Sequence, residues 1–276
     1  MLNIVVCMKW VPDTTQVRMD PETNTLIREG VPSIINPFDV HALEEALRLK
    51  ERYGGTATAI CMGPRFATEG LSKAVSLGLD RGILLTDRAL IGSDTLATSY
   101  ALAQAIRKLD SEKPVDVVFC GKQTIDGDTA QVGPGIATRL RMTQFTYVRE
   151  VVQVDLKRRT IRVRRNLEGA HEVVEGPLPA VLTVLPDINK PRYASLPSLI
   201  KGLRYQVPVW SAADAGIDPK QAGLGGSPTK VRRVFSPPQR SGGGVMWKDA
   251  DDLEAVASAL ADMLEQAEVV GKKAGG

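Results

Sequence analysis

Four apolar runs of strand length, each followed by a helical pattern, dominate the first half of this 276-residue chain. The runs cover residues 2–8, 56–63, 82–86 and 115–120, and the helical patterns cover residues 39–53, 65–77, about 94–109 and the end of the stretch 120–140. Strands that alternate with helices and are apolar throughout are typical of a parallel sheet that is covered on both faces. We therefore predict an α/β fold built on a Rossmann-like parallel sheet.

The pattern changes after about residue 144. Residues 151–166 alternate apolar and charged side chains around a polar turn, which predicts an added β-hairpin with one wet face, and residues 179–185 read as one more buried strand. Proline and glycine then become frequent, and we predict an extended arm over 190–245 and a helix over 249–267. The expected organisation is a nucleotide-binding α/β domain over residues 1–189 and a C-terminal arm and helix over residues 190–276.

The composition excludes several classes of partner. A net charge of +3 gives no case for nucleic acid or an anionic membrane. Three cysteines without a CxxC spacing, and only two histidines, argue against a disulfide framework and a metal site. No apolar run reaches bilayer length and no basic segment precedes the first strand, so we expect a cytoplasmic protein without a signal peptide that meets membranes only through partners.

Polar and small residues gather where the predicted strands end. Ligands of an open parallel sheet sit beyond the carboxyl ends of its strands. Cys7 ends the first strand, Met62 lies at the end of the second, and the stretch CGKQTIDGDTAQVGPGIATRL (120–140) follows the fourth. We expect Gly127 to adopt a positive φ in a tight turn that brings backbone close to a ligand.

Two of the loops also open helices. Residues 93–99 (SDTLATS) and 124–131 (TIDGDTAQ) place small and hydroxyl residues where the first helical turn leaves backbone N–H groups unpaired. Such a terminus attracts phosphate, although Asp94 and Thr129 could equally be helix caps and nothing more. Two such starts on one sheet edge favour a bound nucleotide, but the spacing does not distinguish a mononucleotide from a dinucleotide.

Longer stretches resemble the small (beta) subunit of electron-transfer flavoproteins. They are VVCMKWVPDT (5–14), INPFDVHALEEALRLK (35–50), GLDRGILLTDRA (78–89), GKQTIDGDTAQVGPGIA (121–137) and PRYASLPSLIKG (191–202). The resemblance covers most of the chain and extends to the bifurcating, FixA-like subtype. It implies a sheet of the adenine nucleotide alpha hydrolase-like type and a glycine-rich stretch that wraps an adenine nucleotide.

The nucleotide implied by the resemblance is AMP in simple members and a second FAD in electron-bifurcating ones. Bifurcating members carry a run like GSDTLATS, which residues 92–99 match, so the resemblance favours FAD. The candidate cofactor-binding residues at these loops are Cys7, Asn36, Pro37, Phe38, Asp39, Met62, Asp94, Thr95, Ala97, Thr98, Ser99, Gly121, Lys122, Gln123, Thr124, Ile125, Asp126, Gly127, Asp128, Thr129, Ala130, Gln131 and Val132.

The resemblance further implies a heterodimer with the large (alpha) subunit. In the implied reaction NADH gives hydride to the FAD in this chain, and the two electrons then part. One passes through the alpha-subunit FAD to a quinone oxidoreductase or an acyl-CoA dehydrogenase, and the other passes to ferredoxin or flavodoxin. We expect no catalytic side chain and no enzyme activity from this chain alone. Two alternatives stay open: a non-bifurcating carrier with structural AMP that passes electrons from dehydrogenases to a quinone oxidoreductase, and a nucleotide-binding module without a redox role.

Overall fold

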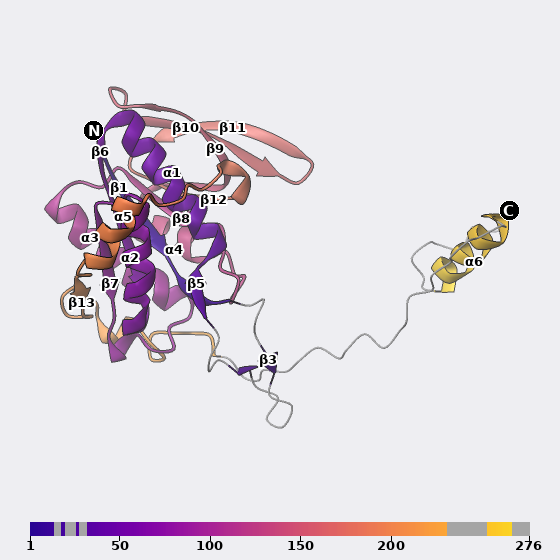
Figure 1. Cartoon of the computed structure of the whole chain (residues 1–276), viewed down its shortest axis with the longest axis horizontal. Helices are drawn as coiled ribbons and strands as arrows, with labels where there is room; N and C mark the ends of the chain where they lie inside the picture. The colour runs from indigo at the N-terminus through magenta and orange to yellow at the C-terminus, as the bar shows by residue number, and fades with distance from the viewer. Residues whose placement is uncertain (14–17, 20–25, 28–31, 231–252, 267–276) are drawn as a thin grey trace. The chain divides into compact units, whose positions relative to one another are not determined.

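A central sheet flanked by helices forms the body of the chain (Figure 1). The computed structural model describes residues 1–13, 18–19, 26–27, 32–230 and 253–266. The alternating part of the chain runs as β1 (Leu2–Met8), α1 (Pro37–Tyr53), β6 (Gly55–Met62), α2 (Thr68–Leu77), β7 (Arg81–Leu85), α3 (Thr95–Glu112), β8 (Val117–Gly121) and α4 (Val132–Leu140). All four predicted strands and all four predicted helices are therefore confirmed, and the fold is α/β with a mostly parallel sheet.

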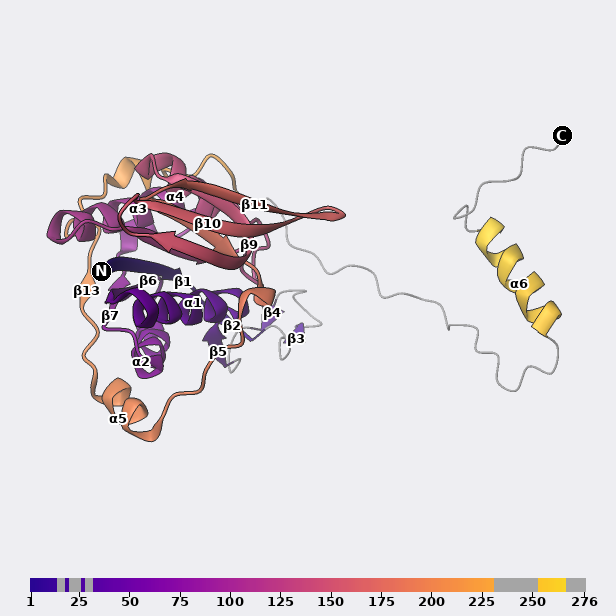
Figure 2. The ribbon, with the colours of Figure 1, turned by 90° about the horizontal axis from the view of Figure 1, so that it is seen from above.

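The helices cover the two faces of the sheet in pairs. Figure 2 shows α1 and α2 on one side and α3 and α4 on the other. This division follows the two-residue period of the strands: Ile4 and Val6 of β1 pack with α1 and α2, while Val5 packs with α3 and α4. The predicted burial of these strands on both faces is therefore explained by the helices that cover each face of the sheet.

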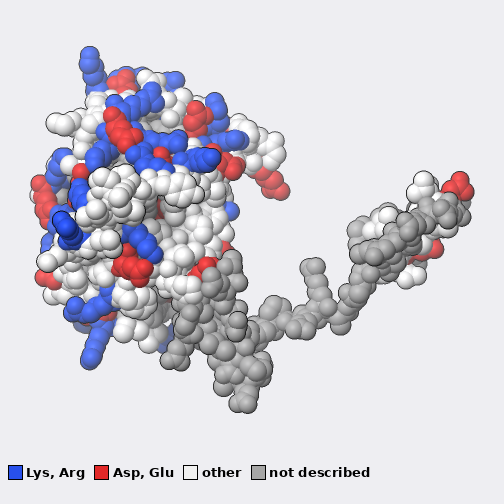
Figure 3. All heavy atoms as spheres, in the orientation of Figure 1, with Lys and Arg blue, Asp and Glu red and all other residues white. Residues whose placement is uncertain are grey.

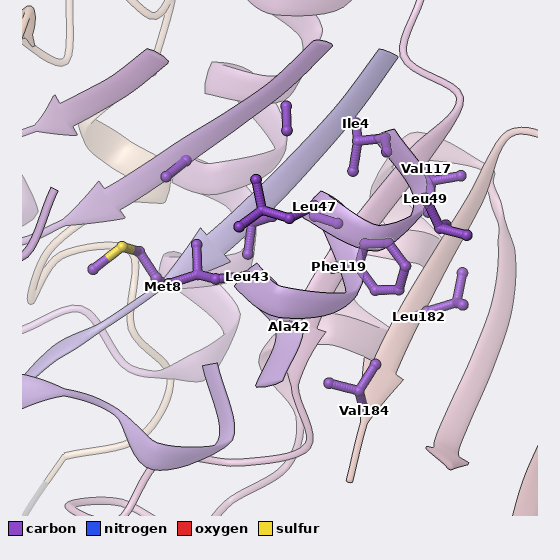
Figure 4. Close-up of a cluster of buried hydrophobic side chains, with 14 of the residues drawn as sticks. Ile4, Met8, Ala42, Leu43, Leu47, Leu49, Val117, Phe119, Leu182 and Val184 are labelled. Atoms are coloured by element: carbon purple, nitrogen blue, oxygen red, sulfur yellow. The ribbon is translucent and has the colours of Figure 1, made fainter. Parts of the chain in front are cut away.

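The larger apolar cluster lies between α1 and the sheet (Figure 4). Leu43 and Leu47 of α1 project onto β1 and β8, where Ile4 and Phe119 are fully buried. Asn36 precedes this helix and Gly54 ends it, with φ at +68°. A residue without a Cβ enters this left-handed region at little cost, so glycine fits the stop between α1 and β6.

An antiparallel extension lengthens one side of the sheet. It contains β9 (Thr143–Asp155), β10 (Thr160–Leu167) and β11 (Ala170–Pro177), so the predicted hairpin over 151–166 is part of three strands rather than two. Its basic residues are largely ion-paired, as in Arg162 with Glu175 and Arg165 with Glu172. Acidic and basic side chains are accordingly interspersed on the face in Figure 3.

Two strands from later in the sequence complete the sheet. The full order is β11-β10-β9-β12-β8-β1-β6-β7-β13. The predicted strand at 179–185 is β12 (Ala180–Val184), which lies between β8 and β9 and is parallel to both. The two residues of β13 (Val209–Trp210) pair with β7 at the other edge. The remaining short strands form two separate ladders, one from β2 (Trp10–Pro12) and β5 (Ser33–Ile35) and one from β3 (Arg18–Met19) and β4 (Leu26–Ile27).

The first part of the expected arm lies on the body of its own chain. Helix α5 (Leu196–Arg204) packs against α2, because Gly202 comes so close to Ser76 that a Cβ would clash. Ser227 then accepts a hydrogen bond from Asp94 N–H at 2.8 Å. The compact unit extends over Met1–Val234, which differs from the expected boundary at 189/190. Proline and glycine lower the regularity of this segment without detaching it.

The remainder of the expected arm, residues 231–245, lies outside the described residues. A second unit, Phe235–Gly276, contains the expected C-terminal helix as α6 (Leu253–Gln266). Leu253, Leu260 and Met263 of this helix are largely exposed. None of the helices in the described ranges combines the length and hydropathy required to cross a bilayer.

Candidate nucleotide-binding site

A cleft of about 360 Å³ opens at the carboxyl ends of β1 and β8. From β1 the chain continues through α1 to β6 on one side of the sheet, whereas from β8 it continues through α4 toward β9 on the other. The two neighbouring strands therefore feed loops in opposite directions. This is the topological switch point at which open α/β sheets bind their ligands, and the volume lies within the usual range of small-molecule sites.

Two cysteines lie at the floor of the cleft. Cys7 of β1 and Cys120 of β8 are register partners on adjacent strands, and both thiols are free and buried. The hydrogen bond with Cys7, together with burial, raises the pKa of the Cys120 thiol. Burial likewise raises the pKa of Cys61 to about 12. The raised pKa values suppress the thiolates of Cys61 and Cys120, which favours packing over reaction chemistry for these two side chains.

Asp39 joins the ends of the two strands beneath the cleft. Its carboxylate accepts a hydrogen bond from the backbone N–H of Lys9 at 2.8 Å and another from Gly121 N–H at 3.0 Å. The side chain is buried, and burial raises the pKa of Asp39 to about 7 although both hydrogen bonds favour the ionised form. Asp39 thus holds β1 and β8 at a fixed separation where the ligand would sit.

Asn36 fixes the loop that follows β8. Its amide donates to Gln123 O at 2.9 Å and accepts from Ile125 N–H at 3.2 Å, and the side chain is fully buried. The same loop is tied down by an ion pair of 2.6 Å between Lys9 and Asp126. Burial opposes the ionisation of Asp126, but the hydrogen bond and charge of the Lys9 ammonium favour it, and the net effect lowers the pKa of that carboxyl. Asn36 and Asp126 shape the cleft from behind without lining it.

The strained backbone of this loop lies after Gly127. Asp128 and Ala130 have φ values of +51° and +54°, whereas Gly127 does not adopt a positive φ. The prediction that Gly127 adopts a positive φ in the turn is therefore wrong. Asp128 tolerates the left-handed conformation because short polar side chains bond locally, and its carboxylate accepts a hydrogen bond from Gln123 at 2.8 Å. The glycine that the packing requires is Gly121, where a Cβ would overlap Asp39 and lie 2.6 Å from Phe38 Cβ.

The two predicted helix starts face one cleft. Thr95 and Thr98 of α3 line it together with Gln131 and Val132 at the start of α4. The hydroxyl of Thr95 donates to Gln131 Oε1 at 3.1 Å, so the two loops are in direct contact. Gln131 makes no capping hydrogen bond to α4, which leaves that terminus open to an acceptor from a ligand.

Asp94 is a helix cap, as the simpler interpretation had it. Its carboxylate accepts from Ala97 N–H at 3.0 Å, and also from the backbone and hydroxyl of Thr229. Thr129, by contrast, precedes the N-cap Gln131 and lines the cleft. Both residues thus line the cleft, but of the two only Asp94 caps a helix.

Fifteen of the candidate residues line the cleft, by comparison of the expected set with its walls. They are Cys7, Asp39, Met62, Asp94, Thr95, Thr98, Gly121, Lys122, Gln123, Thr124, Gly127, Thr129, Ala130, Gln131 and Val132. The candidates outside its walls are Asn36, Pro37, Phe38, Ala97, Ser99, Ile125, Asp126 and Asp128. Ser99 is one of these because its side chain is buried against Gly135 of α4 and donates to Leu96 O at 2.8 Å.

The cleft also has walls that the candidate set lacks. They are Met8, Lys9, Leu90, Gly92, Ser93, Leu102, Cys120 and Gly133. Leu102 lies four residues after Thr98 and seven after Thr95, so helical periodicity was a signal that could have found it. Leu90 comes from the 3₁₀ turn Arg88–Leu90, for which the sequence offered no comparable signal.

The fold defines an α/β protein of the Rossmann-like class, with a cleft at its topological switch point. The model of the electron transfer flavoprotein domain matches residues 23–215. The protein FixA of Azotobacter vinelandii is 48% identical over 268 residues, which cover 96% of this chain and 95% of that protein. The electron transfer flavoprotein subunit beta of Clostridium acetobutylicum is 48% identical over 265 residues, covering 96% and 99%. That of Megasphaera elsdenii is 44% identical over 274 residues, covering 98% and 100%.

This chain belongs to the electron-transfer flavoprotein family, as a FixA-like beta subunit. Members of the family bind flavin or an adenine nucleotide, and beta subunits pair with an alpha subunit. The predicted family is confirmed.

Proposed function

We propose that this chain binds FAD in the cleft between β1 and β8 and serves as the NADH-accepting subunit of an electron-bifurcating flavoprotein. Its alpha partner would carry one electron through a second FAD to a high-potential acceptor, a quinone oxidoreductase or an acyl-CoA dehydrogenase. The other electron would go to ferredoxin or flavodoxin. The bound FAD supplies the redox chemistry, while the chain binds and orients it.

The contact between Thr95 and Gln131 carries this proposal. It makes one wall from two helix starts: the uncapped start of α4 leaves backbone N–H groups for an anion, and the start of α3 adds the hydroxyls of Thr95 and Thr98. A single adenosine monophosphate needs only one such phosphate position. A second start on the same cleft supports a ligand with a diphosphate, and Lys122 adds a positive charge to the wall.

The remaining walls fit the adenine nucleotide portion of FAD. Met62, Leu90 and Val132 give apolar contact for a flat ring system, and Gln123 and Thr124 offer hydrogen bonds for a ribose. Asp39, itself part of the wall, and Asn36 behind it hold the strand ends and the loop in place. The alternative, a structural AMP in a non-bifurcating carrier, uses the stretch 121–133 but leaves Thr95 and Thr98 without a ligand.

The flavin content of the purified heterodimer tests the proposal. We expect two FAD per heterodimer, and one FAD with one AMP would establish the alternative. Replacing Thr95 and Thr98 together by Val removes two hydrogen bonds to charged oxygens, worth about 3–6 kcal/mol in sum. The variant should lose one flavin and keep the other.

A matched control uses a threonine outside the cleft. Thr138 lies on α4 and donates its hydroxyl to Pro134 O at 3.1 Å, so Thr138→Val should leave flavin content unchanged. Full retention of two flavins by the Thr95/Thr98 variant at wild-type affinity would refute the assignment of α3 to the diphosphate.

A further inference from the structure

Strand β9 contains a β-bulge where it pairs with β12. Between the pairs Phe145–Leu182 and Val148–Val184, two residues of β9 lie opposite one residue of β12. One of the two is Tyr147, whose φ is +57°. Bulges of this kind re-aim a side chain and are over-represented beside ligand sites. The direction that this bulge gives to Tyr147 is therefore of interest for the cleft.

The bulge brings Tyr147 out of the core at the cost of backbone strain. A strict two-residue period would bury its ring on the same face as Phe145. The extra residue instead keeps Phe145 and Val148 buried and leaves Tyr147 41% exposed. A positive φ is rare for a bulky residue, because its Cβ then comes too close to the following carbonyl oxygen. Strain of this kind persists where the surrounding structure enforces it, and it clusters at ligand sites.

The exposed ring lies against Lys122, a residue of the cleft wall. Lys122 Nζ is 5.2 Å from the centroid of the Tyr147 ring, within the range of a cation–π contact. The backbone N–H of Lys122 donates to Val184 O at 2.9 Å. Strand β12 therefore fixes the main chain of Lys122, and the Tyr147 ring restrains the ammonium at the end of its flexible stem.

Lys122 differs in its contacts from the other lysine of the wall. Among the described residues, Lys9 and Lys122 are the lysines that line the cleft. The Lys9 ammonium is paired with the Asp126 carboxylate at 2.6 Å, whereas the Lys122 ammonium contacts a ring. A carboxylate neutralises the charge of its partner, but a neutral ring holds a cation and leaves its charge in place. Lys122 is thus restrained and still able to attract an anion.

We propose that Tyr147 is a positioning residue of the cleft, whose ring holds the Lys122 ammonium where it meets a phosphate of the bound nucleotide. This inference rests on the part of the proposed function that places a nucleotide in the cleft. It is the same for FAD and for AMP, because both carry a phosphate. An ammonium that is held before the ligand arrives loses less conformational freedom on binding, which favours affinity.

The test uses the heterodimer of full-length chains that keeps the alpha-subunit FAD and has been stripped of the nucleotide of this chain. FAD and AMP are each titrated into the wild type, into Tyr147→Leu, which lacks a π face, and into Tyr147→Phe, which keeps the ring. Tyr147→Leu should weaken binding about twofold to fivefold, and Tyr147→Phe should bind as the wild type does.

A matched control breaks a similar contact elsewhere. The Arg52 guanidinium also lies 5.2 Å from a tyrosine ring, that of Tyr53, and neither residue lines the cleft. Tyr53→Leu should therefore leave nucleotide affinity unchanged. An equal loss in Tyr53→Leu would show that the effect of Tyr147→Leu is not specific to the cleft, and would overturn the inference.

A double-mutant cycle shows whether Tyr147 acts through the lysine. Lys122→Met keeps an unbranched side chain and removes the charge, and in that background Tyr147→Leu should have no further effect on affinity. Additive losses would show that Tyr147 only shapes the wall, and wild-type binding by Tyr147→Leu would show that it does not act on the nucleotide. A Tyr147→Leu chain that no longer pairs with the alpha subunit would make Tyr147 a subunit contact. Each of these results overturns the inference.

The proposed function fails separately. A wild-type heterodimer that binds AMP but not FAD in the cleft refutes the assignment of FAD. The same cycle of Tyr147 and Lys122 variants, titrated with AMP, then still decides the role of Tyr147.

Discussion

Replacing Gly121 by Ala should damage the sheet edge that carries the cleft. An added Cβ would overlap the Asp39 carboxylate and approach Phe38 Cβ to 2.6 Å. These atoms belong to the first turn of α1, which is packed on β1 and β8, so they have little room to move. Overpacking of this kind costs about 1–3 kcal/mol. Displacement of Asp39 would also weaken its hydrogen bond from Gly121 N–H, which adds about 1.5–3 kcal/mol.

Gly127→Ala is the control from the same loop. Its Cβ would lie 3.5 Å from Thr124 Oγ1, an ordinary contact, and its backbone does not require glycine. The change in the free energy of unfolding should stay within about 1 kcal/mol, whereas Gly121→Ala should lower it by about 2.5–6 kcal/mol, a large share of a typical domain's stability.

Urea unfolding monitored by tryptophan fluorescence measures this difference, because Trp10 and Trp210 are buried in the described body of the chain. FAD titration of the same variants reports the cleft. Equal unfolding midpoints for the two alanine variants would refute the packing argument, and a greater loss for Gly127→Ala would return the constraint to the turn.

Two further changes test residues that hold the cleft walls in place. Burial raises the pKa of Asp39 to about 7, so between about pH 4 and 7 the folded chain holds a proton that the unfolded chain has released. Stability therefore falls as the pH rises through this window, and Asp39→Asn should reduce that fall. If the urea midpoints of the variant change between pH 5 and 7.5 as much as those of the wild type, the argument is wrong. Asp94→Ala removes the α3 cap and the contacts with Thr229 and should lower the free energy of unfolding by about 1–2 kcal/mol. Thr229→Val keeps the cap and should lower it by less. Equal losses for the two variants in urea unfolding would contradict the capping role.

The sequence was most informative where one period repeats for a whole element. The buried strands and the four helices around them were predictable because their apolar residues follow a period of two or of 3.6. Two-residue pairing such as β13 leaves no such pattern. Residues 190–245 were read as an arm because proline and glycine lower the regularity of a segment. In the described part of that segment, Gly202 and Ser227 show that irregular backbone can still pack closely.

The candidate site was predictable as a set of loops but not as a set of contacts. Strand ends and helix starts gave most of the walls, since these ends meet at one edge of any parallel sheet. Asn36 and Asp39 were both expected at the nucleotide; Asn36 holds the loop backbone outside the cleft walls, and Asp39 lines the cleft while it joins two strands. A polar residue near a site can bind the ligand or support those that do, and only the register of distant segments decides which.

The position of β12 has a consequence for how the chain is made. All the residues that line the cleft have been synthesised once the chain reaches residue 133. Strand β8, however, acquires its second neighbour, β12, only when residues 180–184 leave the ribosome. At about 5–20 residues per second, the nascent chain carries a central strand with one unpaired edge for several seconds. Such an edge is a template for wrong pairing. A fragment that ends near residue 140 therefore contains all the residues of the cleft and yet lacks strands β9 to β12, so the cleft walls and the completed sheet are made at different stages of translation.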